Sequence, residues 1–118
     1  MKRLGNELHC IMHEDPGHAW IGVKIDLVKQ SGVEISPFSY QRGKTAYLEE
    51  DCDAPAFIRA IELQGFKVFK DYRHTDRNSP IRSYAPFSQE GTFLREYFAK
   101  QKAEQFMKDH FVVVHVGR

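Results

Sequence analysis

The first third of the chain alternates between apolar and polar residues in short runs that turn residues separate. Residues 7–13 mix apolar and polar side chains in a run that suits a short strand, and residues 15–17, Asp-Pro-Gly, then give a strong turn signal. Residues 19–23 provide a returning strand. Apolar positions in 25–28 followed by Gly32 predict one or two helical turns that end at a glycine cap.

Two further β-prone runs, residues 38–40 and 46–49, predict a β-hairpin. They flank a five-residue loop, 41–45, in which Gly43 can take the left-handed conformation. Period-two alternation divides the side chains between two faces of the hairpin. We expect Phe38, Tyr40, Ala46 and Leu48 on one face and Ser39, Tyr47 and Glu49 on the other.

The strongest helix signal follows an acidic run. Asp51 or Asp53 can cap a helix that has Pro55 in its first turn, and apolar residues then recur on one helical face until Gly65 ends it. Residues 66–72 alternate again, which predicts another strand.

Residues 73–89 are rich in Asn, Ser, Pro, Asp and Arg, which predicts a long loop. Beyond it, Thr92 can cap a helix that extends to Asp109, and residues 111–116 form the apolar, β-branched run typical of a buried strand. The whole pattern predicts an α+β fold, with a small mixed or antiparallel sheet and two to three helices in a single layer on it.

Composition adds limits to this fold. A chain of 118 residues, 42% of them hydrophobic, favours one core and therefore a single domain over residues 1–118. The net charge of +1 provides no overall field for nucleic acid or anionic membranes. No segment has the apolar length of a signal peptide or a membrane span, so we expect a cytoplasmic protein. Cys10 and Cys52 are expected to be free, buried thiols.

Three histidines near the start of the chain are weak candidates for a metal site. Imidazole is a common ligand of zinc and similar ions, and His9, His13 and His18 lie within ten residues. On a strand, however, His9 and His13 would be about 13 Å apart, which is too far for one ion unless His18 folds back. Ordinary surface or turn histidines are the favoured interpretation, and we predict no cofactor.

A second group has the side chains of an acid–base site. The turn before His18 and Trp20 can place an imidazole beside an indole, and Glu49, Glu50 and Asp51 supply carboxylates that can share a proton or hold a cation. The simpler alternative is a core tryptophan and a helix N-terminus that favours negative charge. These residues stay candidates, and none is assigned as catalytic.

Residues 67–82 form a basic segment with aromatic residues between its cations. This pattern is typical of single-stranded nucleic-acid binding. Its residues can equally neutralise the acidic run within the fold. The sequence contains no phosphate-binding glycine loop, no GxSxG and no HExxH, so the commoner nucleotide, hydrolase and metalloprotease motifs are missing. The candidate nucleic-acid residues are Lys70, Arg73, Arg77 and Arg82.

Several segments together resemble a group of small uncharacterised proteins encoded by bacteriophages and plasmids. These are PGHAW at 16–20, ISPFSY at 35–40, YLEEDCD at 47–53 with Gly43 before it, and SPIRSY at 79–84. The resemblance covers about residues 9–88, and residues 92–116 look like a C-terminal extension. It implies a mobile-element protein of the bacterial cytoplasm, a setting in which small domains bind host or defence proteins or nucleic acid, but no established activity.

We therefore predict a binding module that contacts a host or defence protein. The first alternative is a small-ligand binder or enzyme with a His/carboxylate site, and the second is nucleic-acid binding. The sequence indicates no membrane contact and does not define the oligomeric state. The predicted binding residues are His18, Trp20, Tyr40, Arg42, Tyr47, Glu49 and Arg82.

Overall fold

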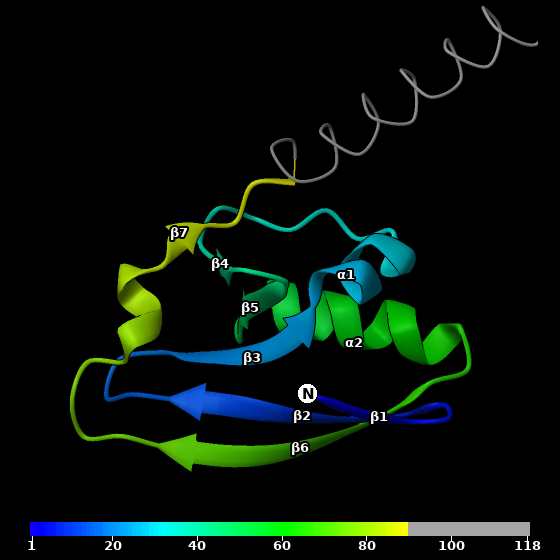
Figure 1. Cartoon of the computed structure of the whole chain (residues 1–118), viewed down its shortest axis with the longest axis horizontal. Coiled ribbons are helices and arrows are strands. Elements are labelled where there is room, and N and C mark those ends of the chain that lie inside the picture. Colours follow the sequence, from blue (N-terminus) through cyan, green and yellow to red (C-terminus); the bar gives the residue numbers. More distant parts are fainter. Residues whose placement is uncertain (90–118) are drawn as a thin grey trace, which may run out of the picture. The chain divides into compact units, whose positions relative to one another are not determined.

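The computed structural model describes residues 1–89, and its contacts group Met1–Ser88 into one compact unit (Figure 1). The predicted helix 92–109 and strand 111–116 lie outside the described residues, so the single domain over 1–118 stays a prediction. Within the described part the α+β fold is confirmed. Its elements are β1 (Lys2–Leu4), β2 (Glu7–Glu14), β3 (Ala19–Lys24), α1 (Ile25–Ser31), β4 (Tyr40–Arg42), β5 (Thr45–Glu49), α2 (Asp53–Leu63), β6 (Lys67–His74), the 3-10 helix η1 (Pro80–Ser83) and β7 (Ala85–Pro86).

The strands of residues 1–89 form one seven-stranded sheet, which is larger than the small sheet predicted. β6 pairs in parallel along the whole of β2, and α2 is the crossover that leads into it. β6 occupies one edge of β2 along its whole length. The other edge is therefore shared, end to end, by β1 and β3. From β3 the sheet continues through β5 and β4 to β7 by antiparallel pairs, so the sheet is mixed.

The hydrophobic core lies between one face of the sheet and the two helices. Met12, Ile21 and Leu48 are register partners on neighbouring strands, and all three are buried. Helix α2 contacts β5, β6 and α1, and its Phe57 is fully buried. Burial of one such side chain contributes about 1.5–3 kcal/mol, so this layer holds the scaffold that carries the opposite face.

The β4–β5 hairpin is tighter than predicted. Arg42 pairs with Thr45, so the turn has two residues rather than five, and Gly43 has φ of 60° at its first position. A two-residue turn pairs even positions with odd ones, and Tyr40 therefore faces Tyr47. The prediction that grouped Tyr40 with Ala46 and Leu48 is wrong, because it assumed the longer loop.

The acidic run also differs from the prediction at the start of α2. The N-cap residue is Cys52, which makes no side-chain cap, whereas Asp53 is the buried first residue of the helix. The carboxylate of Glu49 accepts the Asp51 N–H at 2.8 Å and the Cys52 N–H at 3.1 Å. The prediction that Asp51 or Asp53 caps the helix is thus wrong, and Glu49 instead holds the turn and the N-cap residue that lead into α2. Gly65, with φ of 99°, follows the helix end as predicted.

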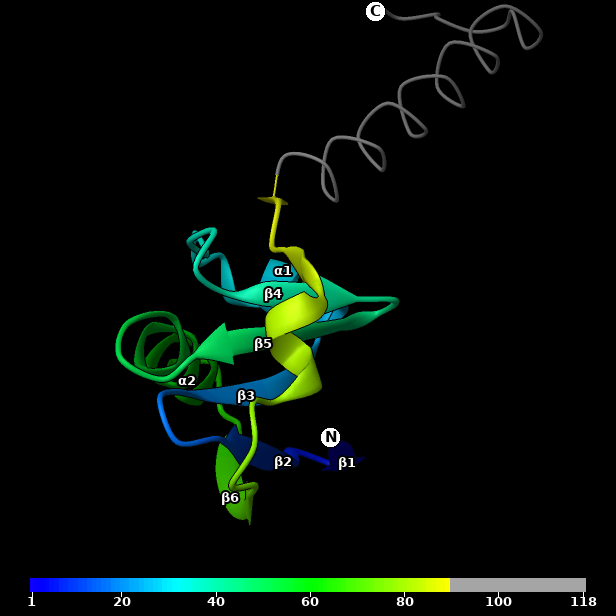
Figure 2. The ribbon, with the colours of Figure 1, turned by 90° about the vertical axis from the view of Figure 1, so that its left-hand side faces the viewer.

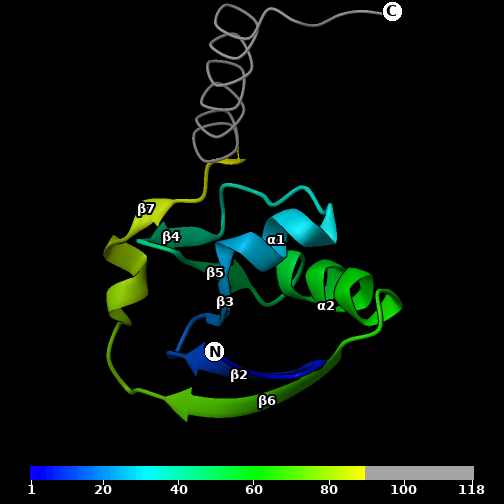
Figure 3. The same ribbon diagram turned by 45° about the vertical axis from the view of Figure 1, so that its right-hand side comes forward.

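The predicted long loop 73–89 contains ordered elements. β6 extends to His74 because its last residues keep pairing with β2. The Ser79 hydroxyl then accepts the N–H of Ile81 and caps η1, which begins at Pro80. η1 and α2 lie apart, with β3 and β5 between them (Figures 2 and 3). The Ser79-Pro80 pair, which lies in the predicted loop, thus starts a helical turn.

The two cysteines are both free, but only Cys10 is buried, while Cys52 is exposed. The expectation of two buried thiols is wrong for Cys52, because the residue caps a helix at the surface instead of facing the core. Among the described helices, none has the length and apolar character needed to cross a membrane.

Candidate functional site

The register of the sheet gathers aromatic side chains on the face opposite Ile21 and Leu48. Trp20 is paired with His13 on one side and with Glu49 on the other. Directly opposed residues point to the same face, with Cβ atoms about 4.5–5.5 Å apart. A carboxylate therefore stands next to the indole on this surface.

Tyr40 and Tyr47 extend the same face across the hairpin. The Tyr40 ring meets the Trp20 ring at a centroid distance of 6.0 Å and an angle of 73°, so the two rings form a corner. Tyr47 lies between His13, at 5.8 Å, and Tyr84, at 5.3 Å. Edge contacts of this kind add about 0.5–1.5 kcal/mol each to the burial of the rings. They fix the side-chain orientations of this face.

One buried carboxylate ties the β2–β3 turn to η1. Asp15 Oδ2 accepts the Nε of Arg82 at 2.6 Å and the N–H of Ser79 at 2.9 Å, and Oδ1 accepts the Arg82 Nη2 at 2.9 Å. Oδ1 also accepts the backbone N–H groups of Gly17 and His18. The hydrogen bond from Arg82, with these backbone donors, holds the pKa of Asp15 well below its usual range.

The guanidinium of Arg82 is held between the turn and the tryptophan. Its central carbon lies 5.5 Å from the centroid of the Trp20 ring, and a Cβ on Gly17 would come within 2.8 Å of Nη2. The hydrogen bond to Asp15 raises the pKa of Arg82 further, so the guanidinium stays charged. Glycine at 17 provides the space for this arrangement.

The loop before β4 is fixed from inside the fold. The Asp53 carboxylate accepts hydrogen bonds from the hydroxyls of Ser36 and Ser39 and from the Ser36 N–H. The Ser39 oxygen in turn accepts the N–H of Glu49 at 2.9 Å. Phe38 lies between these two serines, and its side chain is turned outwards with 77% of its surface exposed. A buried polar network thus presents an apolar ring at the surface.

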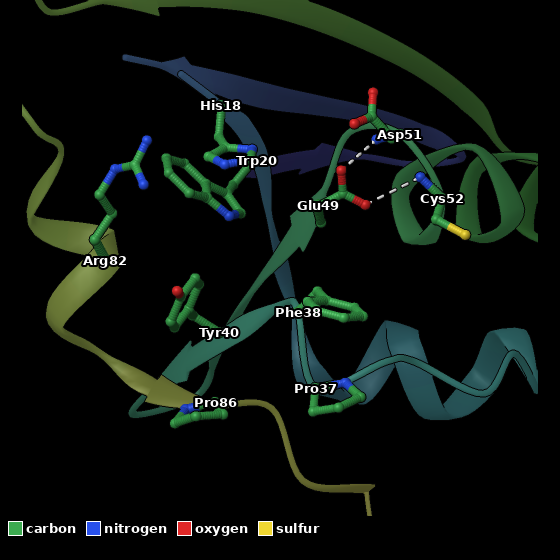
Figure 4. A pocket seen from close by; sticks show the side chains of 10 residues that line it. All are labelled: His18, Trp20, Pro37, Phe38, Tyr40, Glu49, Asp51, Cys52, Arg82 and Pro86. Carbon is green, nitrogen blue, oxygen red and sulfur yellow. Dashed lines mark hydrogen bonds between the residues drawn. The ribbon is translucent and has the colours of Figure 1, made fainter. Parts of the chain in front are cut away.

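These parts enclose a pocket of about 450 Å³ (Figure 4), a size that accepts a small molecule or one side chain. In this view Trp20 lies between Arg82 on one side and Glu49 on the other. Its lining comes from the β2–β3 turn, β3, the loop before β4, β4, the end of β5, η1 and β7. The lining residues are His18, Trp20, Pro37, Phe38, Tyr40, Glu49, Asp51, Cys52, Arg82 and Pro86.

The structure brings together most of the residues that the sequence singled out for binding. His18, Trp20, Tyr40, Glu49 and Arg82 all line this pocket, as does the acid–base candidate Asp51. The remaining three lie elsewhere: Glu50 lines a separate cavity against α2, Tyr47 packs on Tyr84, and Arg42 donates to the Tyr84 hydroxyl.

The candidate nucleic-acid residues do not share one surface. Lys70 pairs with Cys10 and Arg73 with His13, so these two cations of β6 point to opposite faces of the sheet. Arg82 lies on η1 and forms an ion pair with Asp15. The charges are therefore divided between different sides of residues 1–89.

The three histidines of the weak metal candidate have separate neighbours. His9 stacks on Phe69 at 4.8 Å, His13 meets Tyr47, and His18 lies 5.9 Å from Trp20. Burial, with the nearby positive charge of Arg73, lowers the pKa of His13. In the described part of the chain no group of three or more His, Cys, Asp or Glu is placed to hold a metal ion.

Sequence reasoning missed Asp15 and Phe38. Asp15 was read as part of a turn, although an Asp before Pro-Gly commonly accepts the N–H groups of its own turn, as here. Its ion pair with Arg82, 67 positions away, gives no signal in the sequence. Phe38 was expected within a strand, whereas it lies in the turn before β4. Its serine neighbours were the available signal, because they bond to Asp53.

No family model, curated protein or solved structure matches this chain. The resemblance to phage and plasmid proteins stays a prediction.

Proposed function

We propose that this protein is a binding module whose working surface is the pocket around Trp20. The observation that carries the proposal is the convergence of His18, Glu49 and Arg82, from three separate segments, on one cavity with aromatic walls. Pockets that combine an apolar lining with a few placed polar groups are the usual form of a ligand site.

A protein partner that inserts one side chain is the first candidate occupant. Phe38 and Asp51 line the pocket and are exposed, and an exposed aromatic ring beside a cavity is typical of contact surfaces. The resemblance to mobile-element proteins supports a cytoplasmic host or defence protein as that partner.

A small ligand, or an enzyme substrate, is the second candidate occupant. His18 and Glu49 line the same cavity, so an imidazole and a carboxylate both face its contents. Glu49 also accepts the N–H groups of Asp51 and Cys52, just before α2, through its two oxygens, which fits a fixed acceptor better than a group that must exchange a proton. Binding is therefore favoured over catalysis.

The proposal is tested by affinity capture with the full chain. Phe38→Ala removes an exposed wall of the pocket and leaves the core unchanged, and Tyr72→Ala removes an aromatic ring, 60% exposed, from β6 away from the pocket. We expect partners identified with the wild-type chain to be lost with Phe38→Ala and kept with Tyr72→Ala.

For a small ligand the same pair of variants is compared in an NMR screen of metabolites. Hits that bind to the wild-type chain and to Tyr72→Ala, but several-fold more weakly to Phe38→Ala, support the second occupant. If Phe38→Ala keeps every partner and every ligand at wild-type strength, the pocket is not the working surface and the proposal fails.

A further inference from the structure

The charges that line the pocket do not cancel. Arg82 is the lining residue with a fixed positive charge, and the buried carboxylate of Asp15 lies against it at 2.6 and 2.9 Å. The Asp15 side chain has no exposed surface, so this ion pair is satisfied within the fold. Glu49 and Asp51 remain, on the opposite side of Trp20 in Figure 4, and Asp51 is exposed. The pocket therefore carries net negative charge.

The walls suit the apolar part of a cation. Phe38, 77% exposed, and Tyr40, half-buried, offer ring surface to the pocket, while Trp20 is only 2% exposed and lies beneath Tyr40, its edge-to-face neighbour. Aromatic faces attract cations through their quadrupole, and quaternary ammonium groups are recognised by exposed aromatic rings. Within this site Trp20 already has one cation over its ring, the guanidinium of Arg82.

Glu49 keeps the capacity to take part in binding. Each of its two oxygens accepts one backbone N–H from the turn that leads into α2, whereas a carboxylate offers about four lone-pair positions. The two bonds fix the carboxylate in place beside Trp20, its partner across the strands. A cation that enters the pocket meets a preorganised negative charge.

We infer that the pocket binds an organic cation with an apolar shell, an alkylated ammonium group, carried either by a small molecule or by a side chain. This inference rests on the proposed function, because it names the ligand class of the same site. It assigns the rings of Phe38 and Tyr40 to the alkyl groups, and Glu49 with Asp51 to the charge. A simple anion is disfavoured, because Asp15 already neutralises Arg82.

The test compares choline with 3,3-dimethyl-1-butanol, which has the same shape and no charge. The chain has a single Trp, so its one indole N–H signal in an NMR spectrum of the full-length protein reports the pocket directly. We expect choline to shift this signal with a Kd at least tenfold lower than that of the neutral alcohol. Sodium acetate, added as an anionic probe, is expected to leave the signal in place.

Two variants and one control assign the charge preference. Glu49→Gln keeps the volume and one acceptor oxygen and should bring the two Kd values within about threefold of each other. Asp51→Asn, which removes an exposed charge, should weaken choline binding by a smaller factor. This variant replaces Glu49→Gln as the test of the charge preference if Glu49→Gln disturbs the fold. Glu50→Gln makes the same charge change in the separate cavity and should leave the tenfold preference intact.

Each contrary result overturns the inference in a recognisable way. Equal affinity for choline and the alcohol shows a pocket that binds by shape, and stronger binding of acetate shows that Arg82 governs the site. If none of the three probes shifts the signal, binding of an organic cation in this pocket is also excluded. In all three cases the proposed function stands or falls separately, on the capture experiment with Phe38→Ala.

Discussion

At the scale of single residues, Asp15 joins the β2–β3 turn to Ser79 and Arg82, beside the pocket, although it does not line the pocket itself. Five N–H donors converge on its two oxygens, from the turn, from Ser79 and from Arg82. A buried carboxylate is tolerated only where such donors replace water. The same bonds place Arg82 against Trp20.

We predict that Asp15→Asn lowers the melting temperature at pH 7, because an asparagine amide offers one acceptor oxygen and turns a donor towards other donors. The pKa of Asp15 is lowered by folding, so its contribution to stability is complete above the ordinary value of about 4 and is lost as the pH falls below it. Urea unfolding between pH 7 and pH 2 measures this.

The matched control is Asp76→Asn, because the Asp76 side chain is 97% exposed. The wild-type chain and Asp76→Asn should lose stability alike between pH 5 and pH 2, while Asp15→Asn should lose less. Parallel pH profiles for all three chains would show that Asp15 is not held ionised by the fold.

At the scale of elements, the β4–β5 hairpin sets which residues reach the pocket. Its two-residue turn pairs Tyr40 with Tyr47, and this register turns Tyr40 towards Trp20. Positive φ at Gly43 allows the turn. A five-residue loop would shift the pairing by one residue, so that Tyr40 would pair with Ala46 and would point to the other face.

Gly43→Ala should therefore destabilise the fold by about 1 kcal/mol, because an alanine at positive φ is strained. A Cβ there would meet nothing within 4 Å, so the cost is purely one of backbone conformation. Chemical denaturation measures it. Lys44→Ala, at the other position of the same turn, should change the free energy of unfolding by less than about 0.5 kcal/mol; an equal loss in both variants would contradict the turn assignment.

At the scale of the described unit, core and pocket lie on opposite faces of one sheet. Cys10 is within the core layer and Cys52 is at the edge of the pocket. Burial raises the pKa of the Cys10 thiol to about 11, so both its protonation and its position protect it from reagents. The two thiols thus report the two faces independently.

A thiol reagent such as DTNB at pH 8 should label Cys52 rapidly and Cys10 only as the protein unfolds. The native chain should release one equivalent of product in the fast phase, and the urea-unfolded chain two. Cys52→Ser should remove the fast phase, and Cys10→Ser should keep it. Fast labelling of both cysteines in the native chain would mean that β2 is not buried as described.

The local sequence was enough to predict much of the scaffold. The strand 8–13, the turn at 15–17, the short helix before Gly32 and the helix before Gly65 all appear in the structure. Each depends on contacts between near neighbours, namely period-two alternation, proline and glycine geometry, and apolar residues on one helical face. Such signals act within a few residues and are visible in the sequence.

The site needed the tertiary structure. His18, Trp20, Glu49 and Arg82 were named from their chemistry, but their meeting depends on strand register and on the bond from Arg82 to Asp15 across the fold. The sequence by itself determined which elements form and which side chains are available. Tertiary packing decided the parity of the hairpin, the partner of the buried carboxylate and hence the net charge of the pocket, because these are set by contacts between segments far apart in the chain.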